Sequence, residues 1–263
     1  MIGQRHLQEQ LYKFVFLDQL PKSILITGAA GMGKHLFAKT IAEKYNKELI
    51  ELIDLTDDMY TSEALRLYLI DFDKLGKEKR IERFQNTLLK FIEEPPRFAW
   101  IIMVSSNEDI VIDTIKNRCQ IFRFKPYSLQ ELQEIAHLYN RHYPAEFYRF
   151  LYTPQSIIKA DVNTLHSIKA LAQQMLTSLN RATPANALSI RNKFFDEGSY
   201  DLDLFLQIFN EVLLENYLQN PLPQYIIILN KTNEFQKNLQ IMGVNKKDLM
   251  DNWLLALKEE LSK

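Results

Sequence analysis

The stretch GAAGMGKH, residues 28–35, directly follows the apolar run SILIT (23–27) and precedes a helical pattern. A glycine, four further residues, a second glycine and a lysine form the spacing of a phosphate loop, whose backbone N–H groups point at phosphate oxygens. Glycine is needed there because a side chain would block the approach of the phosphate. The stretch therefore predicts a phosphate loop between a strand and a helix, and a plain glycine-rich turn is the alternative. Three of the chain's seven glycines fall within six residues: Gly28, Gly31 and Gly33.

The residue after the lysine departs from the pattern. A hydroxyl normally stands there and holds Mg²⁺, whereas His35 offers an imidazole nitrogen to a metal that prefers hard oxygen ligands. We expect ATP or ADP still to bind and Mg²⁺ to be held poorly. Alternatively, His35 caps the helix start or packs against the sheet. The candidate nucleotide-binding residues are Gly28, Gly31, Gly33, Lys34 and His35.

Five apolar runs predict the strands of one parallel α/β sheet. The first four lack polar alternation, as strands covered on both faces do, and helical patterns separate most of them. Pro126 ends the fifth. The runs are SILIT (23–27), ELIELIDL (48–55), LYLIDF (67–72), AWIIMVSS (99–106) and QIFRF (120–124).

Two amphipathic patterns predict helices that pack on this sheet, KHLFAKTIAEKY after the loop and RIERFQNTLLKFIEE before the fourth strand. The residues on their apolar faces are Phe37, Ile41 and Tyr45 in the first, and Phe84, Leu88 and Phe91 in the second.

The second half of the chain is predicted to be mostly helical. Ser128 and Glu131 form a capping box, and strand-like runs become scarce after it. YIIILN (225–230) would suit a strand by propensity, and we predict helix because its neighbours are helical. NRATP (180–184) and DEGSYD (196–201) are expected to be turns. The expected helices cover about 165–179, 185–196, 201–219, 223–242 and 245–261.

Composition excludes several classes of protein. The net charge is -1, so a globally basic nucleic-acid binder is excluded, although a local basic patch is not. Cys119 is the only cysteine, which leaves no internal disulfide and no four-thiolate zinc site, and we expect no metal site. The start MIGQRHLQEQ is polar, and no stretch approaches the roughly 18 apolar residues of a membrane span. These features predict a cytoplasmic protein with no membrane partner.

The third strand ends in an acidic pattern, LYLIDFDKL. Asp71 stands at the carboxyl end of the sheet, where the magnesium-orienting acid of phosphate-loop ATPases lies. In such ATPases a glutamate that activates water comes next, and here that residue is Phe72. Asp73 is a weak substitute, since it shares a face with Asp71 only if the strand continues. Loss of the hydroxyl at 35 and the carboxylate at 72 makes hydrolysis in the chain's own pocket improbable.

Several segments together resemble the AAA+ ATPase subunits of DNA clamp loaders, especially the delta prime and gamma/tau subunits of bacterial DNA polymerase III. The pairing of LLKFIEEPP with a later NRCQ is the most specific of these signals, because general AAA+ proteins share only the Walker loops. The resembling segments are IGQRHLQEQL (2–11), GAAGMGKH (28–35), LYLIDFDKL (67–75), LLKFIEEPP (88–96), VSSN (104–107) and NRCQIFRF (117–124).

This resemblance implies roles for further residues. Arg118 would be a trans arginine finger that reaches the γ-phosphate held by a neighbouring subunit, with a solvated surface arginine as the alternative. Asn107, with the two serines before it, would orient water or γ-phosphate, or simply cap a strand end. Around TPQSIIK (153–159) the usual sensor 2 arginine is missing. The short linker 56–66 leaves no room for the zinc module of many bacterial relatives.

The resemblance also implies three domains: an AAA+ α/β domain at 1–125, a small helical lid at 126–165 and a helical collar at 166–263. The leading hypothesis is a delta-prime-like stator with impaired ATPase that lends Arg118 to a neighbour. Its expected partners are the other subunits of a hetero-pentameric clamp loader, the sliding clamp and, through the assembly, primed DNA. The alternatives are a working ATPase subunit of gamma type, which uses Asp71 with Asp73, or another AAA+ remodelling or helicase-loading factor.

Overall fold

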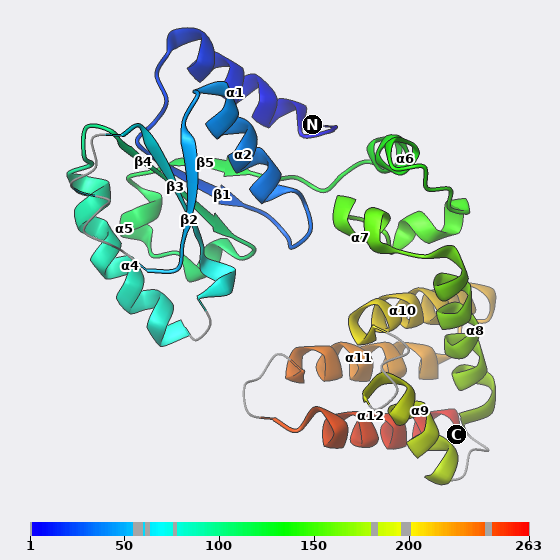
Figure 1. Ribbon diagram of the computed structural model, residues 1–263. Helices are drawn as coiled ribbons and strands as arrows, with labels where there is room; N and C mark the ends of the chain where they lie inside the picture. The colour runs from blue at the N-terminus through cyan, green and yellow to red at the C-terminus, as the bar shows by residue number, and fades with distance from the viewer. Residues whose placement is uncertain are drawn as a thin grey trace. The chain divides into compact units, whose positions relative to one another are not determined.

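The computed structural model of the protein describes residues 2–54, 60, 64–75, 78–179, 184–195, 201–239 and 244–262 (Figure 1). Most of the predicted turns at 180–184 and 196–201, and most of the linker 56–66, lie outside these residues; Pro184 begins a helix and Asp201 caps one. The chain divides into two compact units. The first comprises residues 1–142 and 152–158, and the second comprises residues 143–151 and 159–263.

The first unit is built on a five-stranded parallel sheet, as the apolar runs predict. The strand order is β2-β3-β4-β1-β5, so β1, which leads into the phosphate loop, lies between β4 and β5. All five side chains of β1 are buried. The strands are β1 (Ser23–Thr27), β2 (Glu48–Leu52), β3 (Arg66–Asp71), β4 (Ala99–Ser105) and β5 (Gln120–Arg123).

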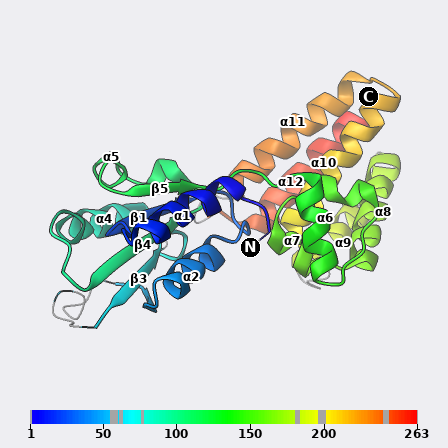
Figure 2. The same ribbon diagram turned by 90° about the horizontal axis from the view of Figure 1, so that it is seen from above.

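Helices cover both faces of this sheet (Figures 1 and 2). On one face, Phe14 of α1 (Arg5–Leu17) and Phe37 of α2 (Lys34–Lys44) both pack edge-on against Phe122 of β5. On the other face, α4 (Glu78–Glu93) and α5 (Asp113–Lys116) share a hydrophobic core with β1, β3 and β4. This double coverage explains why the central strands β1, β3 and β4 are apolar without alternation, whereas the edge strand β2 is partly exposed.

The predicted apolar faces are confirmed. Phe37 and Ile41 are buried on α2, and Phe84, Leu88 and Phe91 are buried on α4. Tyr45 is only half-buried, because α2 ends one residue before it.

Beyond the sheet, α6 (Leu129–Leu138) begins at the predicted capping box. Ser128 Oγ accepts from the Glu131 N–H, and the Glu131 carboxylate accepts from the Ser128 N–H. Two short helices follow, the 3₁₀-helix η3 (Ala145–Arg149) and α7 (Pro154–Lys159). The segment expected to form the lid thus contributes α6 and most of α7 to the first unit and η3 to the second. The three-domain division itself stays a prediction.

The second unit is helical, as predicted, and YIIILN lies within a helix, α11. Its core is centred on Trp253, whose ring stacks on Phe235 at a centroid distance of 4.9 Å and whose indole N–H donates to Thr232 Oγ1. Among the described residues, no helix is long and apolar enough to cross a membrane. The main helices are α8 (Val162–Ser178), α9 (Pro184–Phe195), α10 (Leu202–Gln219), α11 (Pro223–Asn238) and α12 (Lys246–Leu261).

Candidate functional site

The loop between β1 and α2 has the backbone shape that its glycines predict. Gly28 has φ 144°, and a Cβ there would lie 2.6 Å from the Cβ of Phe124. Gly31 has φ 78°, and a Cβ there would press on Thr153 and Gln155 of the segment around α7. Larger residues at these positions would strain the backbone and clash, so the loop requires glycine for its own packing as well as for a ligand.

The loop ends at the start of α2 in a way that suits an anion. Gly33 is the N-cap residue in a left-handed conformation, and no side chain caps the helix. The first N–H groups of α2 therefore have no side-chain acceptor, which is the arrangement that phosphate uses at helix N-termini. Two contacts hold the loop from outside: the Tyr127 hydroxyl donates to Met32 O at 2.9 Å, and the Gln155 N–H donates to Gly31 O at 3.1 Å. Burial raises the pKa of Tyr127 to about 12, so this hydroxyl keeps its proton.

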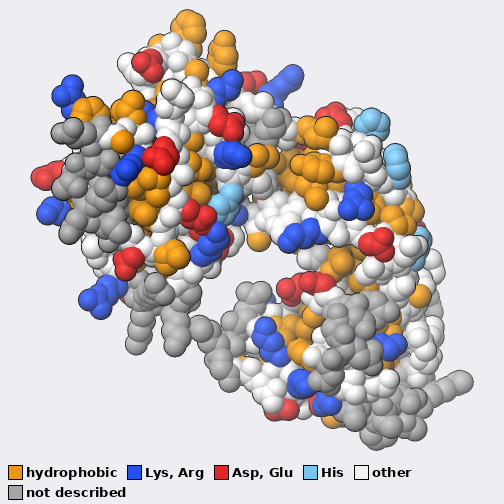
Figure 3. Space-filling view, in the orientation of Figure 1, with side chains coloured by type: hydrophobic (Ala, Val, Ile, Leu, Met, Phe, Trp, Pro, Cys, Tyr) orange, Lys and Arg blue, Asp and Glu red, His pale blue; other side chains and the backbone are white. Residues whose placement is uncertain are grey.

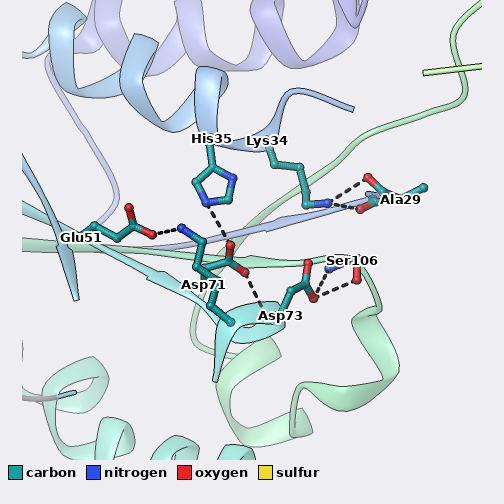
Figure 4. A network of polar contacts seen from close by, with 9 residues as sticks. Ala29, Lys34, His35, Glu51, Asp71, Asp73 and Ser106 are labelled. Carbon is teal, nitrogen blue, oxygen red and sulfur yellow. Dashed lines mark hydrogen bonds and ion pairs between the residues drawn. The ribbon is translucent and has the colours of Figure 1, made fainter. Parts of the chain in front are cut away.

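Lys34 is folded back into its own loop. Its ammonium donates to Gly28 O at 2.5 Å and to Ala29 O at 2.9 Å, and the residue is only 5% exposed (Figure 4). Burial lowers the Lys34 pKa, while the charges of Asp73 and Asp71 oppose that shift. Two of the three ammonium donors are thus used inside the loop, so a phosphate would accept from the third or compete with these carbonyls.

His35 lies against Asp71. Its Nε2 is 3.0 Å from Asp71 Oδ2, and the other carboxylate oxygen accepts from the Asp73 N–H at 2.9 Å (Figure 4). Asp71 is buried, with 5% of its surface exposed, so both of its oxygens are used inside the protein. His35, which stands in place of the usual hydroxyl, and Asp71, the candidate magnesium ligand, are thus in contact with each other.

The local structure at position 72 accounts for the apolar residue that stands where a catalytic carboxylate is usual. β3 ends at Asp71, and the chain then turns into a 3₁₀-helix, η1 (Phe72–Lys74). The Phe72 side chain is fully buried in the core that contains Leu88 and Phe91 of α4. A glutamate here would point into hydrocarbon and away from a phosphate.

Asp73 is committed to the segment that follows β4. Its Oδ1 accepts from both the N–H and the hydroxyl of Ser106, at 2.9 and 2.8 Å (Figure 4). The condition under which Asp73 would share a face with Asp71 is not met, because the strand ends at Asp71 and the 3₁₀-helix begins at Phe72. Asn107 Oδ1 accepts from the Asp109 N–H and so caps a second 3₁₀-helix, η2 (Glu108–Ile110). The Asn107 side chain thus caps η2 and not the strand end that the alternative named, and its role toward water or phosphate stays a prediction.

Arg118 stands apart from these groups, just after α5. Its Nη2 is 3.1 Å from Glu93 Oε1, its Nη1 donates to Thr114 O at 3.0 Å, and 44% of its side chain is exposed. Arg118 is thus partly exposed and available to a second molecule. The neighbouring Cys119 thiol has its pKa raised to about 12 by burial, which makes it a poor nucleophile.

Sequence reasoning missed two sets of polar contacts. Gln4 forms a double hydrogen bond with the backbone of Lys125, and Glu108 accepts from Thr27 and bidentately from Arg123. Gln4 and Lys125 are 121 positions apart, and Glu108 joins Thr27 at the end of β1 to Arg123 at the end of β5. No local sequence pattern reveals such contacts. Among the described residues, no group of three His, Cys, Asp or Glu side chains could hold a metal ion.

A phosphate loop on a five-stranded parallel sheet, followed by small helices and a helical unit, is the AAA+ arrangement that the sequence predicted. A crystal structure of a DNA polymerase III gamma subunit-related protein from Thermotoga maritima has the same fold. Its TM-score is 0.55 at 12% identity, over 96% of this chain and 99% of that one. The fold class is therefore confirmed.

Sequence comparisons specify the class further. A family model described as "DNA polymerase III, delta subunit" matches residues 49–128. The DNA polymerase III gamma subunit of Buchnera aphidicola is 24% identical over 171 residues, which covers 50% of this chain and 45% of that protein. The replication factor C small subunit of Methanothermobacter thermautotrophicus is 24% identical over 224 residues, 74% of this chain and 69% of the relative. The predicted resemblance to AAA+ clamp-loader subunits is confirmed.

A further relative is longer than this chain. The tau subunit of Escherichia coli is 23% identical over 228 residues, which covers 72% of this chain and 34% of that protein. The chain thus spans less than half the length of the gamma and tau relatives that it matches.

Proposed function

We propose that this chain is a delta-prime-like stator subunit of a clamp loader, with little ATP hydrolysis of its own. The contact between His35 and Asp71 carries the proposal. Magnesium in such a site needs a hydroxyl and a carboxylate oxygen. Here the hydroxyl is replaced by the imidazole of His35, whose Nε2 lies 3.0 Å from the carboxylate of Asp71. Hydrolysis also needs a group that accepts a proton from water, and Phe72 is buried at that position.

The phosphate loop would then serve mainly as structure, with passive binding of ATP or ADP. Gly28 and Gly31 pack against Phe124, Thr153 and Gln155, so the loop supports its neighbours without any ligand. The free N–H groups at the start of α2 still offer an anion site. Nucleotide bound there would owe its affinity to backbone N–H groups and Lys34 and would need no metal.

The chain would act on ATP through a neighbour. We propose that Arg118 reaches the γ-phosphate bound by an adjacent ATPase subunit, because a planar and permanently charged fork neutralises charge on the transferred phosphoryl group. The position of Arg118 supports this role, since the side chain is partly exposed. It also precedes Gln120, which pairs with Ile24 near the start of β1, whereas the phosphate loop follows the other end of β1.

Assembly into the collar of a hetero-pentamer is part of the proposal. The helices of the second unit have a core of their own around Trp253, yet apolar side chains remain exposed near the junction of α10 and α11. Leu218 is 78% exposed, and Ile226 and Ile227 are about 40% exposed. Other subunits would cover these residues. The assembly would open a sliding clamp and place it on primed DNA.

DNA contact by this chain alone is not expected. The net charge is -1, and acidic and basic side chains are interspersed on the face drawn in Figure 3. Binding to a polyanion requires a concentration of positive charge, which an assembly of several subunits would provide.

A second candidate is a working ATPase subunit, which the names of the gamma, tau and replication factor C relatives favour. Turnover assays separate the two. The stator proposal predicts negligible ATP hydrolysis by the purified chain. Turnover that Lys34→Ala abolishes would support the working ATPase instead.

The arginine finger has its own test. In a complex reconstituted with the gamma-type ATPase subunit of the same organism, Arg118→Ala should lower hydrolysis at the adjoining site by about a thousandfold. The melting temperature of the isolated chain should change little, because the contacts of Arg118 with Glu93 and Thr114 are exposed. An unchanged rate in the complex would contradict the proposed finger. Failure to co-purify with clamp-loader subunits would contradict the clamp-loader proposal as a whole.

A further inference from the structure

The two most specific motifs of the sequence meet in the folded chain. Glu93, in LLKFIEEPP, is the last residue of α4, and Arg118, in NRCQ, follows α5. Glu93 Oε1 and Arg118 Nη2 are 3.1 Å apart. The side chains are 48% and 44% exposed, so solvent screens the pair and it contributes little to folding. The pair is therefore better suited to orienting a side chain than to stabilising the fold.

Both ends of this contact are fixed to the core of the first unit. Phe91 of α4 and Ile115 of α5 are fully buried in the same hydrophobic cluster, so the two helix ends cannot easily separate. Pro95 and Pro96 follow after Glu94 and prevent α4 from continuing far past its end. Glu93 is thus held at a fixed place beside the segment that carries Arg118.

The two partners hold the guanidinium at two points. Nη1 donates to Thr114 O, the carbonyl one turn back, and Nη2 contacts Glu93. Two contacts define the plane of a guanidinium, which would otherwise sample many rotamers on a flexible stem. Arg118 has five N–H donors, and within the described part of the chain the structure gives it only these two partners. The remaining donors are left for a phosphate.

We propose that Glu93 is the positioning residue of the arginine finger: it orients Arg118 toward the phosphate of a neighbouring subunit. This inference rests on the proposed function of Arg118. Preorganisation of a charged group at the place where transition-state charge develops increases kcat more than it increases substrate binding. Glu93 would thus act on the neighbour's chemistry through Arg118, without touching the nucleotide.

The test uses four variants beside Arg118→Ala in the complex reconstituted with the gamma-type ATPase subunit. Glu93→Ala should lower kcat about tenfold and leave KM for ATP within about twofold, because orientation is lost and binding is not. Glu93→Gln keeps an acceptor oxygen and should retain most of the rate. The control is Glu94→Ala, since Glu94 is the next residue, is exposed and does not contact Arg118. It should match the unmodified protein.

The fourth variant combines Arg118→Ala with Glu93→Ala and should be no slower than Arg118→Ala alone, because Glu93 has nothing left to orient. The inference is overturned if Glu93→Ala leaves kcat unchanged or raises it, if Glu94→Ala lowers it equally, or if the two changes in the double variant are additive. If Arg118→Ala itself has no effect, the proposed finger fails, and that outcome is distinct from the failure of Glu93 alone.

Discussion

The phosphate loop and the end of α5 carry the residues of the proposed function, and they differ in how their polar groups are used. At the loop, Lys34 and Asp71 are each about 5% exposed, and both are bonded to other groups of the chain. At the end of α5, Arg118 is 44% exposed and its partners are a half-exposed carboxylate and a carbonyl. Breaking the buried contacts is costly, whereas an exposed ion pair contributes about 0–1 kcal/mol. This difference is the one that the proposed stator role predicts, with a phosphate loop engaged inside the chain and an arginine accessible to a neighbouring subunit.

The largest effect that bears on this comparison is expected at position 72. Phe72→Glu would supply the missing carboxylate, yet the side chain is fully buried beside Leu88 and Phe91. We expect a loss of about 3–5 kcal/mol in the free energy of unfolding and no gain of ATP turnover, because an aromatic ring is lost and a carboxylate is buried. Urea denaturation measures the loss, and Phe72→Leu, which stays apolar, should lose less. A stable Phe72→Glu variant that hydrolyses ATP would show that the pocket is competent.

The smallest effect concerns Glu108, which pairs with Arg123 near the end of β5. Hydrogen bonds from Arg123, and then from Thr27, hold the pKa of this carboxyl below its usual range. A lowered folded pKa means that the stabilisation is present above the unfolded value of about 4.3 and is lost as pH falls through the folded value.

Glu108→Gln should therefore destabilise the chain by less than about 1 kcal/mol at pH 7, because Arg123 is mostly exposed. The loss should be smaller at pH 3 than at pH 7, because part of the carboxyl is then protonated in the folded protein. Urea denaturation of both proteins at the two pH values checks this expectation. A larger loss of stability at pH 3 than at pH 7 would contradict the role assigned to the Glu108 carboxylate.

Much of the fold follows from sequence pattern. The five strands, the capping box at Ser128 and the helix over 225–230 are predicted by apolar runs and local capping chemistry, which depend on neighbours in the chain. The division into two units was not predicted at its observed place, since residues 143–151 and 152–158 lie in different units. That division depends on which helices pack together, and local pattern does not report it.

The sequence predicted which residues make up the candidate site, but it did not predict which of them contact each other. The glycine spacing identified the loop, and strand position identified Asp71. The contact of His35 with Asp71 could not be read from the sequence, because it requires the register of α2 against β3. The pairing of Glu93 with Arg118 depends on the packing of α4 beside α5, although both motifs were recognised.

Position 35 offers a matched control for the nucleotide site. His35→Ser returns a hydroxyl to the place where Mg²⁺ is normally held and releases one oxygen of Asp71. This variant should bind ATP about tenfold more tightly in the presence of Mg²⁺ than in EDTA, since the metal regains two oxygen ligands. Isothermal titration calorimetry provides the comparison, and a variant with no response to Mg²⁺ would mean that His35 is not what limits the metal.

The same titration on the unmodified chain tests the central claim most directly. ATP is titrated into the isolated protein once with Mg²⁺ and once with EDTA. If His35 and Asp71 have replaced metal chemistry at this site, the two affinities should agree within about twofold. Binding that Mg²⁺ tightens by about tenfold or more would contradict the account, because the chain would then hold a metal-nucleotide complex as a working ATPase does.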